Sequence, residues 1–262
     1  MFPTTHVRTA CPCLTAHWTT SLPYQPNNVA FKRLTGRVSC KAFGVQQLNE
    51  GKALLKKRGS EIASDLRGTC IYLVGMMGSG KSTIGQTLAE AVGYHFFDSD
   101  KLIEKAAGDG RTVSQLMEEE DEESFRDVET EVLKQLSCMG RLVVATGDGI
   151  VLRPMNWSYL RHGVTVWLDV PVEALATTAA DAGEKPRLLL GQVPDASSPD
   201  QAVEKFSDIL KIREPFYADS DATVSLQKVA SRTGLGGVES LTPTMVALEV
   251  LEEIDKLIIR RK

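Results

Sequence analysis

Short apolar runs recur along the chain and are separated by longer segments of mixed polarity. They occupy residues 70–74, 94–97, 142–146, 164–168 and 222–226. The runs are rich in β-branched or aromatic side chains, which is typical of strands buried on both faces. The segments between them repeat apolar residues at helical spacing. This alternation predicts an α/β fold with a five-stranded parallel sheet flanked by helices.

Two amphipathic segments lie outside this alternation. Residues 46–68 place Leu55 and Ile62 among charged residues, which predicts a helix before the first strand. Residues 245–258 predict a closing helix by the same spacing. We assign both helices to packing. Residues 184–201 combine Gly, Pro, Ser and Asp without an apolar period, which is typical of a mobile loop.

A glycine-rich segment follows the first predicted strand. Residues 75–82 read Gly-Met-Met-Gly-Ser-Gly-Lys-Ser and satisfy every fixed position of G-x-x-x-x-G-K-[ST]. Glycines let backbone N–H groups turn around an anion, and the helix that follows directs its free N-terminal donors to the same point. The predicted ATP-binding residues are Gly75, Met76, Met77, Gly78, Ser79, Gly80, Lys81, Ser82 and Thr83.

Two residues of this loop carry distinct chemistry. We expect Lys81 to reach the β- and γ-phosphates and the Ser82 hydroxyl to ligate Mg²⁺. The alternative is a turn that only joins a strand to a helix. The strand before the loop and the helix after it favour the phosphate site.

Composition argues against several other classes of protein. The net charge of −4 gives no reason to expect nucleic-acid binding. No apolar run approaches the roughly 20 residues that cross a bilayer. The five cysteines include no C-x-x-C pair and the four histidines are scattered, so we expect neither a disulfide framework nor a zinc site. The pattern does not indicate an oligomeric state.

The start of the chain differs in charge from the rest. Residues 1–60 hold nine Lys or Arg and a single acid. Residues 1–45 contain no acid and are rich in Thr, Pro, Asn and Ser, which favours a plastid transit peptide processed near Cys40. An ordinary disordered tail is the alternative. We expect a helical extension over residues 46–67 and the main domain over residues 68–262.

Polar residues follow the second and third predicted strands. Asp98 and Asp100 follow the second strand, and Gly147, Asp148 and Gly149 follow the third. In parallel sheets of this class, ligands gather beyond the carboxyl ends of the strands. We therefore expect these residues to lie near the phosphate loop.

Further motifs make the chain resemble the shikimate kinase family, and in particular its plant plastid members, over roughly residues 68–228. Besides the phosphate loop, these motifs are residues 97–104, 124–126, 145–149, 153–157, 167–171 and 187–190. The resemblance implies a P-loop kinase of the nucleoside-monophosphate-kinase type, with a substrate region at about 98–140 and a mobile lid at about 177–201. It also implies Mg²⁺- and ATP-dependent phosphorylation of the 3-hydroxyl of shikimate in the chloroplast, for aromatic amino acid biosynthesis.

The resemblance assigns roles to single residues. Arg126 and Arg213 match the arginines that bind the substrate carboxylate, for which a forked guanidinium is well suited. Asp100 matches the aspartate that orients or deprotonates the attacking hydroxyl, and Asp98 matches the one that reaches Mg²⁺ through water. Glu129 matches the acid that steadies the neighbouring arginine.

The lid completes the expected site. Arg187 matches the arginine that closes over the transferring phosphoryl group. The expected catalytic residues are Lys81, Asp100 and Arg187. The expected substrate-binding residues are Asp100, Arg126, Gly147, Asp148, Gly149 and Arg213. The expected metal ligands are Ser82 and Asp98.

The chain departs from the family pattern at three places. Asp148 replaces the middle glycine of a triple glycine and adds a charge near the expected substrate carboxylate. Two such charges about 4 Å apart repel by roughly 4 kcal/mol at a dielectric near 20, unless Asp148 points away or is paired. Thr178 replaces an arginine that stacks on adenine, at a cost of about 0.5 to 2 kcal/mol. Pro186 precedes the lid arginine, whereas the family has proline after it.

Three functions compete on these residues. The first is a plastid shikimate kinase of reduced activity. The second is a non-catalytic paralogue that keeps the nucleotide site and has a regulatory role, which Asp148 and Thr178 favour. The third is a related kinase such as a gluconate kinase, against which Asp98, Asp100 and Arg126 argue. The retained catalytic and binding residues favour the first.

The transit-peptide prediction is tested by fusing residues 1–60 to a fluorescent protein in plant cells. Because the segment is basic, free of long apolar runs and poor in acids, we expect the fusion to enter plastids. Diffuse cytosolic fluorescence would contradict the prediction.

Overall fold

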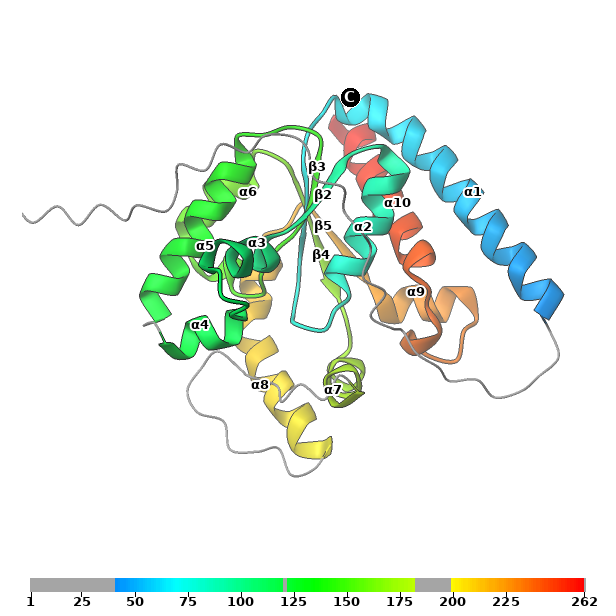
Figure 1. The fold of residues 1–262 in the computed structure, drawn as a ribbon. Helices are drawn as coiled ribbons and strands as arrows, with labels where there is room; N and C mark the ends of the chain where they lie inside the picture. Colours follow the sequence, from blue (N-terminus) through cyan, green and yellow to red (C-terminus); the bar gives the residue numbers. More distant parts are fainter. Residues whose placement is uncertain (1–40, 120–121, 182–198, 262) are drawn as a thin grey trace, which may run out of the picture. The chain divides into compact units, whose positions relative to one another are not determined.

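The computed structural model describes residues 41–119, 122–181 and 199–261. Residues 43–262 form one compact unit. Its centre is a five-stranded sheet in the order β2-β3-β1-β4-β5, and every neighbouring pair is parallel (Figure 1). The strands are β1 (Ile71–Val74), β2 (His95–Asp98), β3 (Leu142–Ala145), β4 (Val164–Asp169) and β5 (Ala222–Ser225). The predicted strands and their parallel arrangement are confirmed.

Register brings the carboxyl ends of the central strands to one edge. Ala145, the last residue of β3, pairs with Asp98 at the end of β2. Ala145 also pairs with Leu73 near the end of β1. The segments that follow β1, β2 and β3 therefore start side by side, as the sequence predicts for a ligand site.

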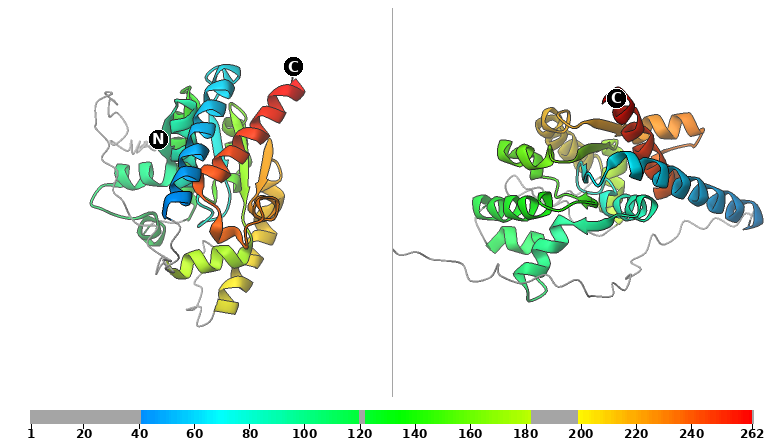
Figure 2. Two further views of the ribbon diagram at one scale, coloured as in Figure 1. Left: turned by 90° about the vertical axis from the view of Figure 1, so that its right-hand side faces the viewer. Right: turned by 90° about the horizontal axis from the view of Figure 1, so that it is seen from above.

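Helices cover both faces of the sheet (Figure 2). The helices α2 and α10 pack against each other on one face, with α1 beside them, and α5 and α6 lie on the other face (Figure 1). Along the chain the helices are α1 (Lys41–Leu66), α2 (Lys81–Val92), α3 (Ser99–Ala107), α4 (Val113–Glu119), α5 (Glu122–Ser137), α6 (Pro154–Leu160), α7 (Val172–Asp181), α8 (Pro199–Tyr217), α9 (Leu226–Thr233) and α10 (Pro243–Arg261). Two 3₁₀ turns, η1 (Ile150–Leu152) and η2 (Val238–Ser240), complete the described elements.

The central strands form the core because their side chains are apolar on both faces. All four residues of β1 and all four of β3 are buried. Helical residues such as Leu88, Val250 and Ile254 are fully buried against them. No helix within the described ranges is long and apolar enough to cross a membrane.

The first helix joins this core through its apolar face. Leu55, Ile62 and Leu66 are buried, and Arg58 donates a hydrogen bond to Asp255 of α10 at 3.1 Å. The helix begins at Lys41 and ends at Leu66, so it starts earlier than the 46–68 segment that the apolar spacing predicts. At Gly59 the helix backbone comes so close to Ala91 of α2 that a side chain there would overlap the Ala91 carbonyl.

This close approach predicts opposite effects for two glycines of α1. We expect Gly59→Ala to lower the free energy of unfolding by about 1 to 3 kcal/mol, because the added methyl group meets backbone. Gly51→Ala should raise it by up to about 1 kcal/mol, because its methyl group would lie 3.7 Å from Thr244 and alanine favours helix. Urea unfolding measures both. Equal effects of the two substitutions would contradict the packing described.

Candidate functional site

The segment between β1 and α2 has the backbone that a phosphate loop requires. Gly75, Gly78 and Gly80 all have positive φ, at 145°, 80° and 80°. A side chain on Gly75 would also lie 2.8 Å from the Leu168 carbonyl oxygen. Glycine is therefore needed at Gly75 for both conformation and space. The strand, loop and helix order that the motif predicts is confirmed.

The loop lysine folds back over its own loop. Lys81 Nζ donates to the carbonyl oxygens of Gly75 and Met76, both at 2.8 Å. Burial lowers the pKa of Lys81, whereas the nearby carboxylates of Asp148 and Asp100 act to raise it. An anionic phosphate is a stronger acceptor than a neutral carbonyl, so the ammonium group has reason to turn toward a bound triphosphate.

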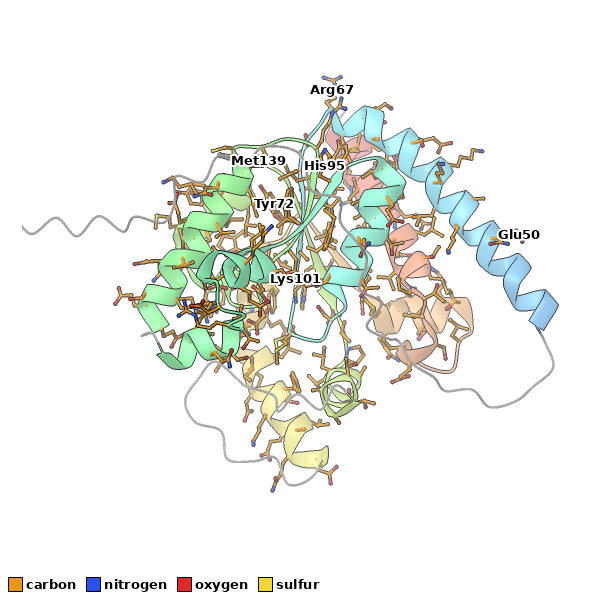
Figure 3. All side chains as sticks on the ribbon, viewed as in Figure 1. Glu50, Arg67, Tyr72, His95, Lys101 and Met139 are labelled. Carbon is orange, nitrogen blue, oxygen red and sulfur yellow. The ribbon has the colours of Figure 1, made fainter. Side chains whose placement is uncertain are left out.

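The two predicted metal ligands lie in contact. Ser82 Oγ donates to Asp98 Oδ2 at 2.5 Å. The other oxygen, Asp98 Oδ1, accepts from the backbone N–H groups of Asp100 and Lys101 and so caps α3. Figure 3 labels Lys101 at this edge, whereas His95, at the start of β2, lies at the opposite edge. The described part of the chain holds no cluster of three His, Cys, Asp or Glu that could bind a metal alone.

Asp100 is a half-buried carboxylic acid among other acids. Loss of contact with water, together with the carboxylates of Asp98, Glu129 and Asp148, raises its pKa from 3.8 to about 7. Lys81 opposes this rise. The carboxyl group of Asp100 therefore gains or loses a proton near neutral pH, as a general base working at that pH must.

The turn after β3 packs against the predicted acceptor residues. Side chains on its two glycines would collide with neighbouring side chains unless those side chains moved. A methyl group on Gly147 would lie 2.6 Å from Asp100 Oδ1 and 2.7 Å from Glu129 Oε1, and one on Gly149 would overlap the Arg126 guanidinium. The Gly147 N–H also donates to Ser99 Oγ at 2.8 Å. The turn thus brings its backbone against the acceptor side chains.

The first acceptor arginine is held by acids of its own helix. Arg126 Nη1 donates to Glu129 Oε2 at 2.5 Å, and both side chains are buried. Within the described ranges, Arg126 Nη2 is buried without a hydrogen-bond partner and lies 3.5 Å from Glu122 Oε1. Burial raises the pKa of Glu129, and Arg126 counteracts this. An anionic ligand that accepted a hydrogen bond from Nη2 would compete with its ion pair to Glu122.

The second acceptor arginine is paired with the residue that breaks the family pattern. Arg213 Nη1 donates to Asp148 Oδ2, and the Arg213 side chain is 2% exposed. Tyr217 Oη donates to the Asp148 backbone oxygen at 2.9 Å, and its ring stacks on Trp167. The repulsion that we expect between Asp148 and the substrate carboxylate holds only if the Asp148 carboxylate is unpaired. The structure shows the paired alternative, because α8 brings Arg213 to the turn.

The remaining predicted residues are placed as follows. Thr178, on α7, lies beside the phosphate loop at Gly78 and donates to its own helix at Ala174. Arg187 and most of the lid at 177–201 fall outside the described residues. A hollow of about 350 Å³ beside Arg126 is lined by Glu122, Glu123, Leu152 and Arg153.

Two site residues were not predicted. Ser99 holds the glycine turn, and its position between two predicted aspartates was a usable signal. Tyr217 binds the same turn from α8, far along the chain. No local motif marks it.

The pKa of Asp100 makes a testable statement about stability. The folded state holds this proton more tightly than the unfolded chain, so the free energy of unfolding should fall as the pH rises from about 4 to 7. Asp100→Asn cannot ionise and should raise that free energy by about 2 to 4 kcal/mol near pH 8, with little change near pH 4. Urea unfolding of the ligand-free protein tests this, with the exposed Asp219→Asn as control. An equal gain at both pH values would contradict the charge argument.

Comparison with known proteins agrees with this geometry. The family model described as shikimate kinase matches residues 77–255. "Shikimate kinase 2, chloroplastic" of Oryza sativa subsp. japonica is 49% identical over 78% of this chain and 66% of that protein, so the chain spans just under two thirds of its length.

Two further similarities bear on function. "Probable inactive shikimate kinase like 1, chloroplastic" of Arabidopsis thaliana is 40% identical over 78% of this chain and 69% of that protein. The structure titled "Shikimate kinase from Acinetobacter baumannii in complex with shikimate" is 33% identical, with a TM-score of 0.55 over 74% of this chain and 94% of that one. With the family model matching more than half of its residues, the chain belongs to the shikimate kinase family.

Proposed function

We propose that the protein transfers the γ-phosphoryl group of ATP to the 3-hydroxyl of shikimate, giving shikimate 3-phosphate for aromatic amino acid biosynthesis. Membership of the family supports this reaction. The observation that carries the proposal is that the phosphate loop and the acceptor residues lie next to each other. Ser82 of the phosphate loop donates to Asp98, which in turn accepts from the backbone N–H of Asp100 on the acceptor side. The charges of Asp100 and Arg213 also act on Lys81 of the loop. Donor and acceptor can therefore meet, as direct phosphoryl transfer requires.

Mg²⁺ fits the oxygen pair at the end of β2. Ser82 and Asp98 offer a hydroxyl and a carboxylate oxygen 2.5 Å apart, and Mg²⁺ prefers oxygen ligands. Two protein oxygens leave the other positions to water and phosphates. When bound, the ion would neutralise charge on the triphosphate.

The acceptor side would be organised by three residues. Asp100 would accept a hydrogen bond from the 3-hydroxyl and take its proton when ionised. Arg126 would offer Nη2, which makes no hydrogen bond to the described residues, to the shikimate carboxylate, with Arg213 as the second cation. We further propose that Lys81 and Arg187 stabilise the transferring group, Arg187 from the lid.

The proposed location is the plastid stroma, after removal of residues 1–45. The basic, acid-free composition of that segment supports this location, as does the word "chloroplastic" in the names of both plant relatives.

A second candidate function is a nucleotide-binding protein without kinase activity. The pairing of Arg213 with Asp148 favours it, because the pair neutralises one of the two cations expected to bind shikimate. The name of the Arabidopsis relative is consistent with such a loss in this family. The two functions differ in one outcome, namely turnover.

A coupled assay with Mg-ATP and shikimate decides between them. The protein should start at Lys41 so that α1 stays whole. We expect ADP formation that needs shikimate and falls on the acid side of pH 7 as Asp100 gains its proton. The Lys81→Ala variant lacks the loop cation and gives the background rate. Asp100→Asn should lower turnover at every pH. Rates no higher than the Lys81→Ala blank would remove the kinase proposal.

A further inference from the structure

We propose that the Asp148 side chain occupies the place on Arg213 that the carboxylate of the acceptor would take, and that Asp148 thereby sets the affinity of the site for acidic acceptors. This inference rests on the proposed function and adds a residue that determines its specificity. It starts from an ion pair between the turn after β3 and α8. Both members lie in the predicted acceptor site.

The two members of the Arg213–Asp148 pair differ in their exposure to solvent. Arg213 is almost fully buried, whereas the Asp148 side chain keeps 15% of its surface exposed. Asp148 is therefore the member of the pair that solvent reaches more readily. Arg213 Nε is buried and has no hydrogen-bond partner among the residues that the structure describes, so the guanidinium has donor capacity that this pairing does not fill.

The turn that carries Asp148 is packed against other side chains of the site. Gly147 and Gly149 are confined by Asp100, Glu129 and Arg126, as the contacts of an added methyl group show. The Asp148 backbone oxygen is held by the Tyr217 hydroxyl. Rotation of the Asp148 side chain would free Arg213 without moving the turn.

The Arg213–Asp148 pair should affect the binding of acidic and of uncharged acceptors differently. A carboxylate must break the ion pair before it can use Arg213, and it then lies near the displaced Asp148 anion. An acceptor without a carboxylate leaves the pair intact and needs only the hydroxyl-binding residues such as Asp100. The pair therefore weakens binding of acidic acceptors selectively. Steric crowding would instead weaken both kinds of acceptor alike.

Calorimetric titration with shikimate and with its uncharged methyl ester separates these effects. Asp148→Gly should lower the Kd for shikimate roughly 10- to 100-fold, since a hydrogen-bonded charge becomes available. The Kd for the ester should change less than about threefold. The Kd for ATP should also change less than that for shikimate, because backbone groups of the loop hold the triphosphate.

Two further variants serve as controls. Asp148→Asn keeps the size of the side chain without its charge, so it should tighten shikimate binding in the same direction even if Asp148→Gly fails to fold. Asp127→Asn removes a carboxylate that pairs with Arg153 close to the same site. It should leave the Kd for shikimate unchanged.

The outcomes distinguish this inference from the proposed function. Turnover with an unchanged Kd for shikimate in both Asp148 variants would overturn the inference and leave the kinase standing. Equal tightening of shikimate and ester would show crowding and would also overturn it. If neither the wild type nor either variant bound shikimate, both proposals would fall.

Discussion

Charged side chains withdrawn from water must find partners, and this requirement shapes the carboxyl edge of the sheet. Acids and bases meet there around the ends of three parallel strands. Arg126 donates to Glu129, and Arg213 donates to Asp148. Lys81 donates to carbonyl oxygens of its own loop. A buried charge that loses its partner costs several kcal/mol, so each of these contacts constrains its neighbours.

This balance links the chemistry of the site to its departure from the family pattern. The acids crowded around Asp100 help keep its pKa near neutrality, where proton transfer is effective. Asp148 adds a charge to that group and satisfies it with Arg213. In the proposed site the extra aspartate does not simply repel a substrate, since it pairs with an arginine that is expected to bind the substrate carboxylate. The same residue can slow a kinase or, if the pair is rarely broken, leave only a nucleotide-binding protein.

Local sequence was sufficient for much of the fold and for half of the site. Apolar runs such as Ile71–Val74 marked strands, because strands buried on both faces need apolar side chains throughout. The loop motif located Lys81 and Ser82, and parallel topology predicted that Asp98 would join them. Long-range contacts were out of reach. The pairing of Asp148 with Arg213 depends on how α8 packs, which no local pattern encodes.

The most direct measurement is transfer of a radiolabelled γ-phosphate from ATP to shikimate, with the labelled position mapped by NMR. If the loop and the acceptor residues form one site, the label appears on the 3-oxygen of shikimate, and Lys81→Ala abolishes it. Release of the label only as inorganic phosphate, or retention of all of it in ATP, would contradict the account.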